Sequence, residues 1–203
     1  MGKTIAIACA GVLLLLILIA GASIGTSYNS LVQLDQATQA QWAQVQNAYQ
    51  RRADLVPNLV ATVKGAANFE KSTMVEVTEA RSKVNQVTPA AMADVLKDPA
   101  AFQRYQQAQQ GLSSALSHLL AVSERYPDLK ATANFRDLQA QLEGTENRIT
   151  VERQRFNDAA RAFNTARNRF PMVLVAGFFG DKFASKPYFL AQPGSEKAPE
   201  VTF

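Results

Sequence analysis

Residues 135–170 read FRDLQAQLEGTENRITVERQRFNDAARAFNTARNRF, and their apolar side chains recur at helical spacing. An apolar residue returns every three, four or seven positions, which is the period of an α-helix and not the strict alternation of a β-strand. The stretch therefore predicts one long helix, at about 129–169, that buries a single face. The members of this face are Phe135, Leu138, Leu142, Thr145, Ile149, Phe156, Phe163 and Phe170.

The same period returns in three earlier segments, which are separated by prolines. Proline begins or ends a helix more readily than it continues one. Short breaks between long helices make neighbouring helices antiparallel. We therefore predict an all-α fold, in which an N-terminal transmembrane helix is followed by an antiparallel up-and-down four-helix bundle with long helices and an extended C-terminal tail. The dividing prolines are Pro57, Pro89, Pro99, Pro127 and Pro171. The predicted bundle helices lie at about 28–52, 56–86, 99–125 and 129–169.

Composition excludes several classes of function. The chain has 203 residues, 47% of them apolar, and a net charge of +4 that is spread among acidic residues. The apolar content excludes a wholly disordered chain, and the scattered charge disfavours nucleic-acid binding. A single cysteine, Cys9, excludes an internal disulfide or cysteine zinc cluster, and a single histidine, His118, excludes multi-histidine metal sites. We expect a non-enzymatic protein with no catalytic residue, cofactor, metal, nucleic acid or small-molecule substrate.

A membrane anchor is predicted at the N-terminus. Residues 4–25 read TIAIACAGVLLLLILIAGASIG without a charge, long enough as a helix to cross a hydrocarbon core of about 30 Å. Lys3 precedes this stretch and the first charge after it is Asp35, so the positive-inside rule favours a cytoplasmic N-terminus. We expect a single-pass membrane protein whose bundle lies on the far side of the membrane from the cytoplasm. A signal peptide cleaved near Ala20-Gly21-Ala22 is the alternative.

A second apolar segment, 170–180, reads FPMVLVAGFFG. It is too short to span a bilayer, and in an up-and-down bundle it follows the helix that returns toward the membrane. Two interpretations stay open, a cap packed on the bundle end or a contact with the membrane or another subunit. Gly21 and Gly25 form a small-residue step that permits close approach of membrane helices. The candidate membrane or subunit contacts are Gly21, Gly25, Phe170, Met172, Leu174, Phe178 and Phe179.

Two polar motifs mark turns that we expect at the membrane-distal end. One surrounds Pro57 and the other is Tyr126-Pro127-Asp128. They either lock each other through ion pairs and caps or form one recognition surface. The candidate interaction residues are Arg51, Arg52, Asp54, Asn58, Tyr126 and Asp128.

Asparagines recur along the last predicted helix, at Asn147, Asn157 and Asn164. Their near-heptad spacing lets them share one face, where they either fix the register between helices or form a polar site. His118 lies among leucines and is interpreted as a satisfied imidazole in the core or at its boundary. The domain boundaries expected are 1–3 for a short N-terminal segment, 4–26 for the membrane helix, 27–180 for the bundle and 181–203 for an extended or disordered tail.

Several distinctive blocks occur along the chain in a fixed order. They are Tyr28-Asn29, Gln50-Arg51-Arg52-Ala53-Asp54-Leu55-Val56-Pro57-Asn58, Thr62-Val63-Lys64-Gly65, Tyr126-Pro127-Asp128, Phe135-Arg136-Asp137-Leu138-Gln139, Leu142-Glu143-Gly144-Thr145-Glu146-Asn147-Arg148-Ile149, Arg155-Phe156-Asn157, Phe163-Asn164, Phe170-Pro171 and Pro199-Glu200-Val201-Thr202-Phe203. Together they resemble the LemA family over essentially the whole chain. The resemblance implies one membrane helix, a helical-bundle domain and a bacterial source, so we expect the bacterial inner membrane with the bundle on its periplasmic or outer side; no enzymatic activity is established for the family. Two departures are phenylalanine at positions 156 and 163, where tyrosine is common, and Ala66, where an aromatic residue is common.

These observations predict a membrane protein that presents a helical bundle for protein–protein interaction. The first hypothesis is a self-associating scaffold or assembly component of the bacterial envelope, hence a homo-oligomer. The alternative is a membrane-tethered adaptor that recruits an unknown protein partner through the distal turns. An enzyme is the remote alternative.

Overall fold

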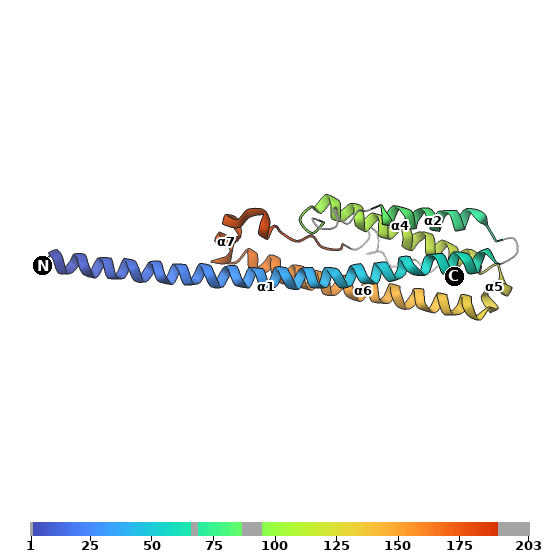
Figure 1. The fold of residues 1–203 in the computed structure, drawn as a ribbon, viewed down its shortest axis with the longest axis horizontal. Coiled ribbons are helices and arrows are strands. Elements are labelled where there is room, and N and C mark those ends of the chain that lie inside the picture. Colours follow the sequence, from blue (N-terminus) through green and yellow to red (C-terminus); the bar gives the residue numbers. More distant parts are fainter. Residues whose placement is uncertain (1, 66–68, 87–94, 191–203) are drawn as a thin grey trace, which may run out of the picture. The chain divides into compact units, whose positions relative to one another are not determined.

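The computed structural model describes residues 2–65, 69–86 and 95–190. This part of the chain is helical and contains no β-strand, so the all-α prediction is confirmed (Figure 1). The elements are α1 (Gly2–Lys64), α2 (Lys71–Asn85), α4 (Pro99–Ser123), α5 (Pro127–Ala131), α6 (Ala133–Arg167), α7 (Met172–Phe179) and a 3-10 helix, η1 (Gly180–Phe183).

The chain divides into two compact units. The anchor unit comprises 1–44 and 158–186, and the bundle unit comprises 45–157 and 187–203. The helices α1 and α6 contribute residues to both units, and each unit is described by itself below.

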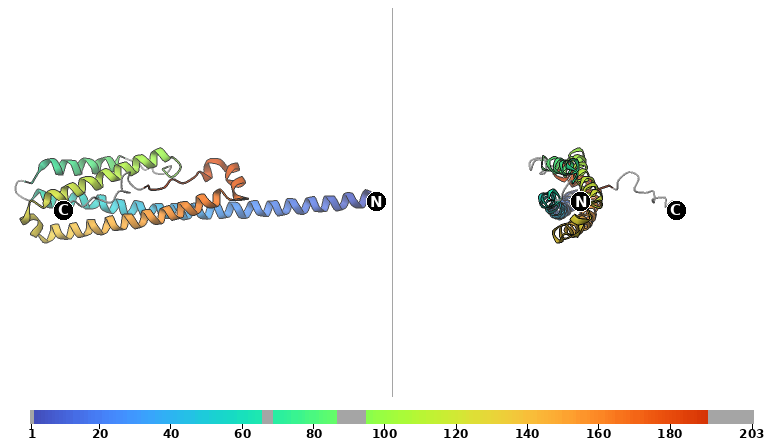
Figure 2. Two further views of the ribbon diagram at one scale, coloured as in Figure 1. Left: turned by 180° about the vertical axis from the view of Figure 1, so that it is seen from behind. Right: turned by 90° about the vertical axis from the view of Figure 1, so that its right-hand side faces the viewer.

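The bundle unit is an antiparallel four-helix bundle, as predicted. The chain runs along α1, returns along α2, runs out again along α4 and returns along α6 (Figures 1 and 2). One apolar side of each helix meets in a common core, and burial of each large aliphatic or aromatic side chain contributes roughly 1.5–3 kcal/mol. The buried core includes Leu59 and Val63 of α1, Val77 of α2, Leu112 and Leu119 of α4, and Phe135 and Leu142 of α6.

The predicted helix break at Pro57 is wrong, because α1 continues through this proline to Lys64. Proline has no N–H to donate to the carbonyl oxygen of Ala53, four residues earlier. Arg81 of α2 supplies the missing donor, with its Nε 3.0 Å from that oxygen. The neighbouring helix therefore satisfies the group that Pro57 leaves unpaired. The turn after α1 lies near Gly65 instead, and α2 begins only at Lys71.

The later prolines behave as predicted where the structure describes them. Pro99 is the first residue of α4, and the Asp98 carboxylate caps that helix by accepting from the backbone N–H of Ala100 at 2.8 Å. Pro127 is the first residue of α5. Pro89 lies outside the described residues.

The anchor unit joins the first part of α1 to the end of α6, α7 and η1. Its core consists of Leu31, Phe163, Val175, Ala176 and Phe183. The large apolar side chains of 12–19 are exposed, and α1 is the one helix in the described chain that is long and apolar enough to cross a membrane.

Backbone hydrogen bonds hold the extended segment that follows η1. In the anchor unit, Asn164 donates to the carbonyl oxygen of Lys186 at 2.9 Å and accepts from its N–H at 2.8 Å. In the bundle unit, Asn157 makes the same pair of bonds to Phe189, both at 2.9 Å. These two asparagines thus hold the backbone of the tail. The predicted tail beyond Leu190 lies outside the described residues.

Candidate functional site

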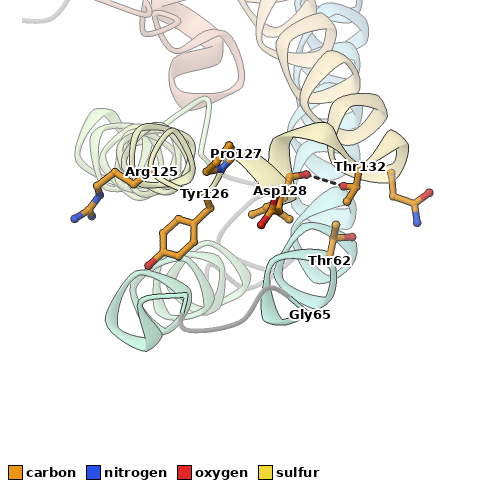
Figure 3. A pocket seen from close by; sticks show the side chains of 9 residues that line it. Thr62, Gly65, Arg125, Tyr126, Pro127, Asp128 and Thr132 are labelled. Carbon is orange, nitrogen blue, oxygen red and sulfur yellow. Dashed lines mark hydrogen bonds between the residues drawn. The ribbon is translucent and has the colours of Figure 1, made fainter.

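An open cleft of about 640 Å³ lies in the bundle unit, where α1 ends and α5 connects α4 to α6 (Figure 3). Two of the predicted interaction residues, Tyr126 and Asp128, line it. The Tyr126-Pro127-Asp128 turn therefore lies beside the end of α1, whereas the partner turn expected around Pro57 does not exist, because α1 continues to Lys64. The lining residues are Thr62, Gly65, Arg125, Tyr126, Pro127, Asp128, Leu129, Thr132 and Asn134.

The wall of the cleft formed by α5 is fixed by local sequence. Pro127 restricts the backbone at the start of the turn, and Leu129 is buried in the core below it. The hydroxyl of Thr132 donates to the carbonyl oxygen of Leu129 at 2.7 Å and closes the turn before α6 (Figure 3). The backbone N–H of Lys130 donates to the carbonyl oxygen of Tyr126 at 3.1 Å. The side chains of the turn consequently project from a well-defined backbone.

The charged side chains around the cleft differ in whether they have an ion-pair partner. Arg125 donates to Glu70 at 2.7 Å, and its side chain points away from Asp128 (Figure 3). The Tyr126 ring lies 4.9 Å from the ring of Phe69, so it is held as well. Asp128 is exposed and makes no ion pair with any residue that the structure describes. The cleft therefore offers one uncompensated carboxylate beside a largely apolar floor.

The end of α1 adds weakly negative groups to the same cleft. The last carbonyl oxygens of a helix carry the negative end of its dipole. Gly65 donates its N–H to Thr62 at 3.3 Å in the last turn, while Lys64 offsets part of this field. The arrangement can accept a cationic or hydrogen-bond-donating group. The described lining residues include no histidine, cysteine or paired carboxylate.

Three further predicted residues lie on the α1 face that leads to this cleft. Arg51, Asp54 and Asn58 are exposed and are spaced three and four residues apart. Continuing that spacing reaches Thr62 and Gly65, which line the cleft, so all five positions share one helix face. They lie on a helix, and the sequence-based expectation of a turn at this point is wrong. A bond between Gln50 and Asp54 at 2.7 Å, one helical turn apart, steadies the carboxylate.

Arg52 lies apart from this surface. Its side chain is only 1% exposed, and its guanidinium bonds Glu146 at 2.7 Å, the Gln109 side chain at 2.6 Å and the hydroxyl of Ser113. It also lies over the ring of Tyr49 at 5.2 Å. Sequence reasoning grouped Arg52 with its neighbour Arg51, but one helical position turns a side chain by about 100° and separates a core residue from an exposed one.

Two tyrosines border the buried Arg52. The rings of Tyr49 and Tyr105 meet edge to face with centroids 5.7 Å apart. Burial raises the pKa of both hydroxyls, and nearby arginines oppose that shift only in part. Both phenols therefore remain neutral at physiological pH and serve the core of the bundle unit.

His118 is on the surface, not in the core. Its side chain is 53% exposed, and Nδ1 lies 2.8 Å from a carboxylate oxygen of Glu76 on α2. The imidazole is satisfied, as expected, but at the surface, where it shares a hydrogen bond with the carboxylate of Glu76. Within the described ranges, no group of three or more histidine, cysteine, aspartate or glutamate side chains could hold a metal ion.

The candidates for membrane or subunit contact belong to the anchor unit. Outside the backbone of α1, no described atom lies within 4 Å of the point where a Cβ would stand on Gly21 or Gly25. Met172 is half-buried against the small core, and Phe179 packs on Tyr28 with ring centroids 5.0 Å apart. The remaining candidates, Phe170, Leu174 and Phe178, are exposed.

Comparison with known proteins places these features in a family. The chain is 26% identical to the magnetosome protein MamQ of Magnetospirillum gryphiswaldense over 189 residues, which cover 86% of this chain and 68% of the relative. The proteins MamQ 1 and MamQ 2 of Paramagnetospirillum magneticum match with the same identity and coverage. The LemA family model matches residues 41–203, which include the bundle, the cleft and α7. This chain therefore belongs to the LemA family.

Proposed function

We propose that this protein is a non-enzymatic, single-pass membrane protein that recruits another protein through the cleft and the adjoining face of α1. The observation that carries the proposal is Asp128, an exposed carboxylate without an ion-pair partner among the described residues, in an open cleft whose arginine is already engaged with Glu70. A segment of the partner with a basic side chain beside apolar ones would fit this chemistry.

The anchor assignment is supported by the exposed apolar surface of α1. In the uncharged stretch 4–25, the described large apolar side chains are all more than half exposed. Exposure of such side chains to water costs roughly 1.5–3 kcal/mol each relative to burial, so a lipid environment is favoured. The helix runs without a break from this stretch into the bundle unit, which supports a retained anchor over a cleaved signal peptide.

The side of the membrane follows from charge. Lys3 precedes the apolar stretch and an acidic residue, Asp35, is the first charge after it. The positive-inside rule places the N-terminus in the cytoplasm and the bundle on the outer side of the inner membrane. The partner would then be a periplasmic or envelope protein.

Site-specific photo-crosslinking tests recruitment through the cleft. A photoreactive residue is placed at Asn134, which lines the cleft, and at Ser114, an exposed position of α4 outside it. In membranes of the native host, we expect a discrete crosslinked product from position 134 and none from 114. Asp128→Asn should abolish that product, whereas Asp137→Asn, which removes an exposed carboxylate outside the cleft, should leave it. A product that survives Asp128→Asn, or that forms equally at 114, would overturn the proposal.

Self-association is a second candidate because the faces of Gly21 and Gly25 are open for a second membrane helix. Sizing of the full chain in nanodiscs distinguishes the two functions. A discrete oligomer that dissociates when both glycines become isoleucine would support a scaffold. A monomer that still forms the crosslink in the cleft would exclude the scaffold and support recruitment of a partner.

A further inference from the structure

The short helix α7 exposes an unusual amount of apolar surface. Phe178 is 85% exposed and Leu174 65% exposed, and they lie four residues apart on one face of the helix. Phe170, just before the helix, is 80% exposed. Large apolar side chains gathered in this way on a surface mark a contact with a membrane or another molecule.

The opposite face of α7 is fixed within the anchor unit. Val175 and Ala176 are buried against Leu31 and Phe163. Packing of this buried face fixes the orientation of α7. The apolar side chains on the other, open face are therefore held toward the outside of the anchor unit.

Aromatic contacts fix the position of α7 along α1. The Tyr28 ring lies 5.0 Å from the Phe179 ring and 5.6 Å from the Phe183 ring. Lys182 donates to the Tyr28 hydroxyl and lies 4.7 Å from the centre of its ring. Within this unit, α7 lies beside the part of α1 that contains Tyr28, and α1 alone extends beyond α7 on the N-terminal side (Figures 1 and 2).

This part of α1 lies at the end of the membrane-spanning stretch. Tyr28 follows Gly25, the last residue of the apolar stretch 4–25, by three positions. At about 1.5 Å per residue this is a rise of about 4–5 Å, well within the headgroup region of a bilayer. A segment held at Tyr28 is consequently held at the lipid interface.

Basic side chains flank the open face. Arg169 precedes it, is exposed and makes no ion pair with the described residues. Arg167 and Lys182 add two more positive charges, against the single acid Asp181. Lys186 is excluded from this count because it pairs with Asp35 at 2.6 Å. The surplus of positive charge complements anionic lipid headgroups.

We propose that the open face of α7, formed by Leu174 and Phe178, inserts together with the adjacent Phe170 into the interface of a bilayer that contains anionic lipid. The inference rests on the proposed membrane anchor and adds a second lipid contact beside it. The two contacts together would hold the anchor unit at a set depth and orientation. A second copy of the chain is the competing occupant, but the basic flanks favour a surface of negative headgroups.

Fluorescence quenching in vesicles tests the proposal on the full chain. In a Cys9→Ala background, single cysteines at Leu174 and Phe178 carry a polarity-sensitive fluorophore. Leu16→Cys reports the anchor, and Ser114→Cys reports an exposed position of α4. The vesicles contain phosphatidylcholine with or without phosphatidylglycerol, and nitroxide lipids place the quencher either near the headgroup or deep in the acyl chains.

We expect probes at 174 and 178 to shift to the blue and to lose emission with the shallow quencher, more strongly when phosphatidylglycerol is present. The probe at 16 should respond to the deep quencher and the probe at 114 to neither. Arg169→Glu should reduce the dependence on phosphatidylglycerol.

Each other outcome overturns a defined part of the account. Quenching at 16 but not at 174 and 178 would retain the anchor and overturn the α7 contact. A blue shift at 178 without lipid quenching would mean that protein covers this face, and would overturn the contact as well. Absence of quenching at 16 would overturn the anchor and the α7 contact together.

Discussion

Arg81 donates its Nε–H to the backbone carbonyl oxygen of Ala53 at 3.0 Å, and this bond crosses from α2 to α1. The oxygen is the one that Pro57 leaves without a helical donor. A side chain of a neighbouring helix thus allows α1 to pass a proline without breaking. The relationship explains why a residue that ends most helices lies inside this one.

Removal of the Arg81 side chain should destabilise the bundle through that oxygen. Arg81→Ala leaves a partly buried acceptor unpaired, and we expect a loss of about 1–3 kcal/mol in the free energy of unfolding. In a Pro57→Ala background the backbone N–H of residue 57 becomes available, so the same substitution should cost less. Denaturation of the detergent-solubilised chain followed by circular dichroism measures both. Equal costs in the two backgrounds would show that Pro57 and Arg81 are not coupled.

Arg52 and Arg51 provide a matched pair for the distinction between core and surface. Arg52→Ala leaves the buried Gln109 without its partner and the 41% exposed Glu146 without its ion pair, and we expect a loss of about 1–3 kcal/mol in the free energy of unfolding. Arg51→Ala removes an exposed side chain and should change that free energy by no more than about 0.5 kcal/mol. Similar thermal shifts for the two variants would contradict the assigned positions.

Asn157 and Asn164 of α6 should hold the extended segment after η1 against the helix. Asn157→Ala removes both hydrogen bonds to Phe189, and Asn164→Ala removes both bonds to Lys186. We expect faster hydrogen exchange at the amide of Phe189 in the first variant and of Lys186 in the second. Asn147→Ala, on an exposed part of the same helix, is the control and should leave both amides protected. If Asn157→Ala or Asn164→Ala left the exchange rate unchanged, that asparagine would not hold the tail.

Buried tyrosines predict a loss of stability at high pH. Burial raises the pKa of Tyr49 and Tyr105 in the folded state, while the unfolded chain ionises near the ordinary tyrosine value of about 10. The unfolded state therefore releases protons first, so their contribution is full below about pH 10 and declines as the pH rises above it. Denaturation midpoints measured across this range should fall, and Tyr49→Phe or Tyr105→Phe should make the fall shallower. The same slope in both variants and the parent chain would exclude these groups as its source.

The apolar period predicted the helices better than it predicted their ends or partners. Spacing alone predicts that Phe156, Phe163 and Phe170 belong to one buried face; the first two are fully buried, but Phe170 is 80% exposed because α6 ends at Arg167. Continuation of α1 through Pro57 depends on Arg81, which lies in another helix, so no local pattern near the proline contains the information.

Polar contacts were less predictable than apolar ones, because their partners also lie in distant parts of the chain. The spacing of Asn157 and Asn164 indicated a shared task, but their partner is an extended tail that has no helical period of its own. The cleft residues Thr62 and Gly65 are absent from the predicted interaction residues, because the turn was expected near Pro57. Their position on the face of Arg51, Asp54 and Asn58 is the signal that could have identified them.

The central claim is that α1 spans the inner membrane and holds the cleft on its outer side. The most direct test is Asn134→Cys in a Cys9→Ala background, treated in intact cells with a small membrane-impermeant thiol reagent. The parent chain, whose only cysteine is Cys9 in the anchor, is the control and should stay unlabelled. The account predicts that position 134 is labelled before lysis. Labelling of position 134 only after lysis would place the cleft in the cytoplasm and contradict it.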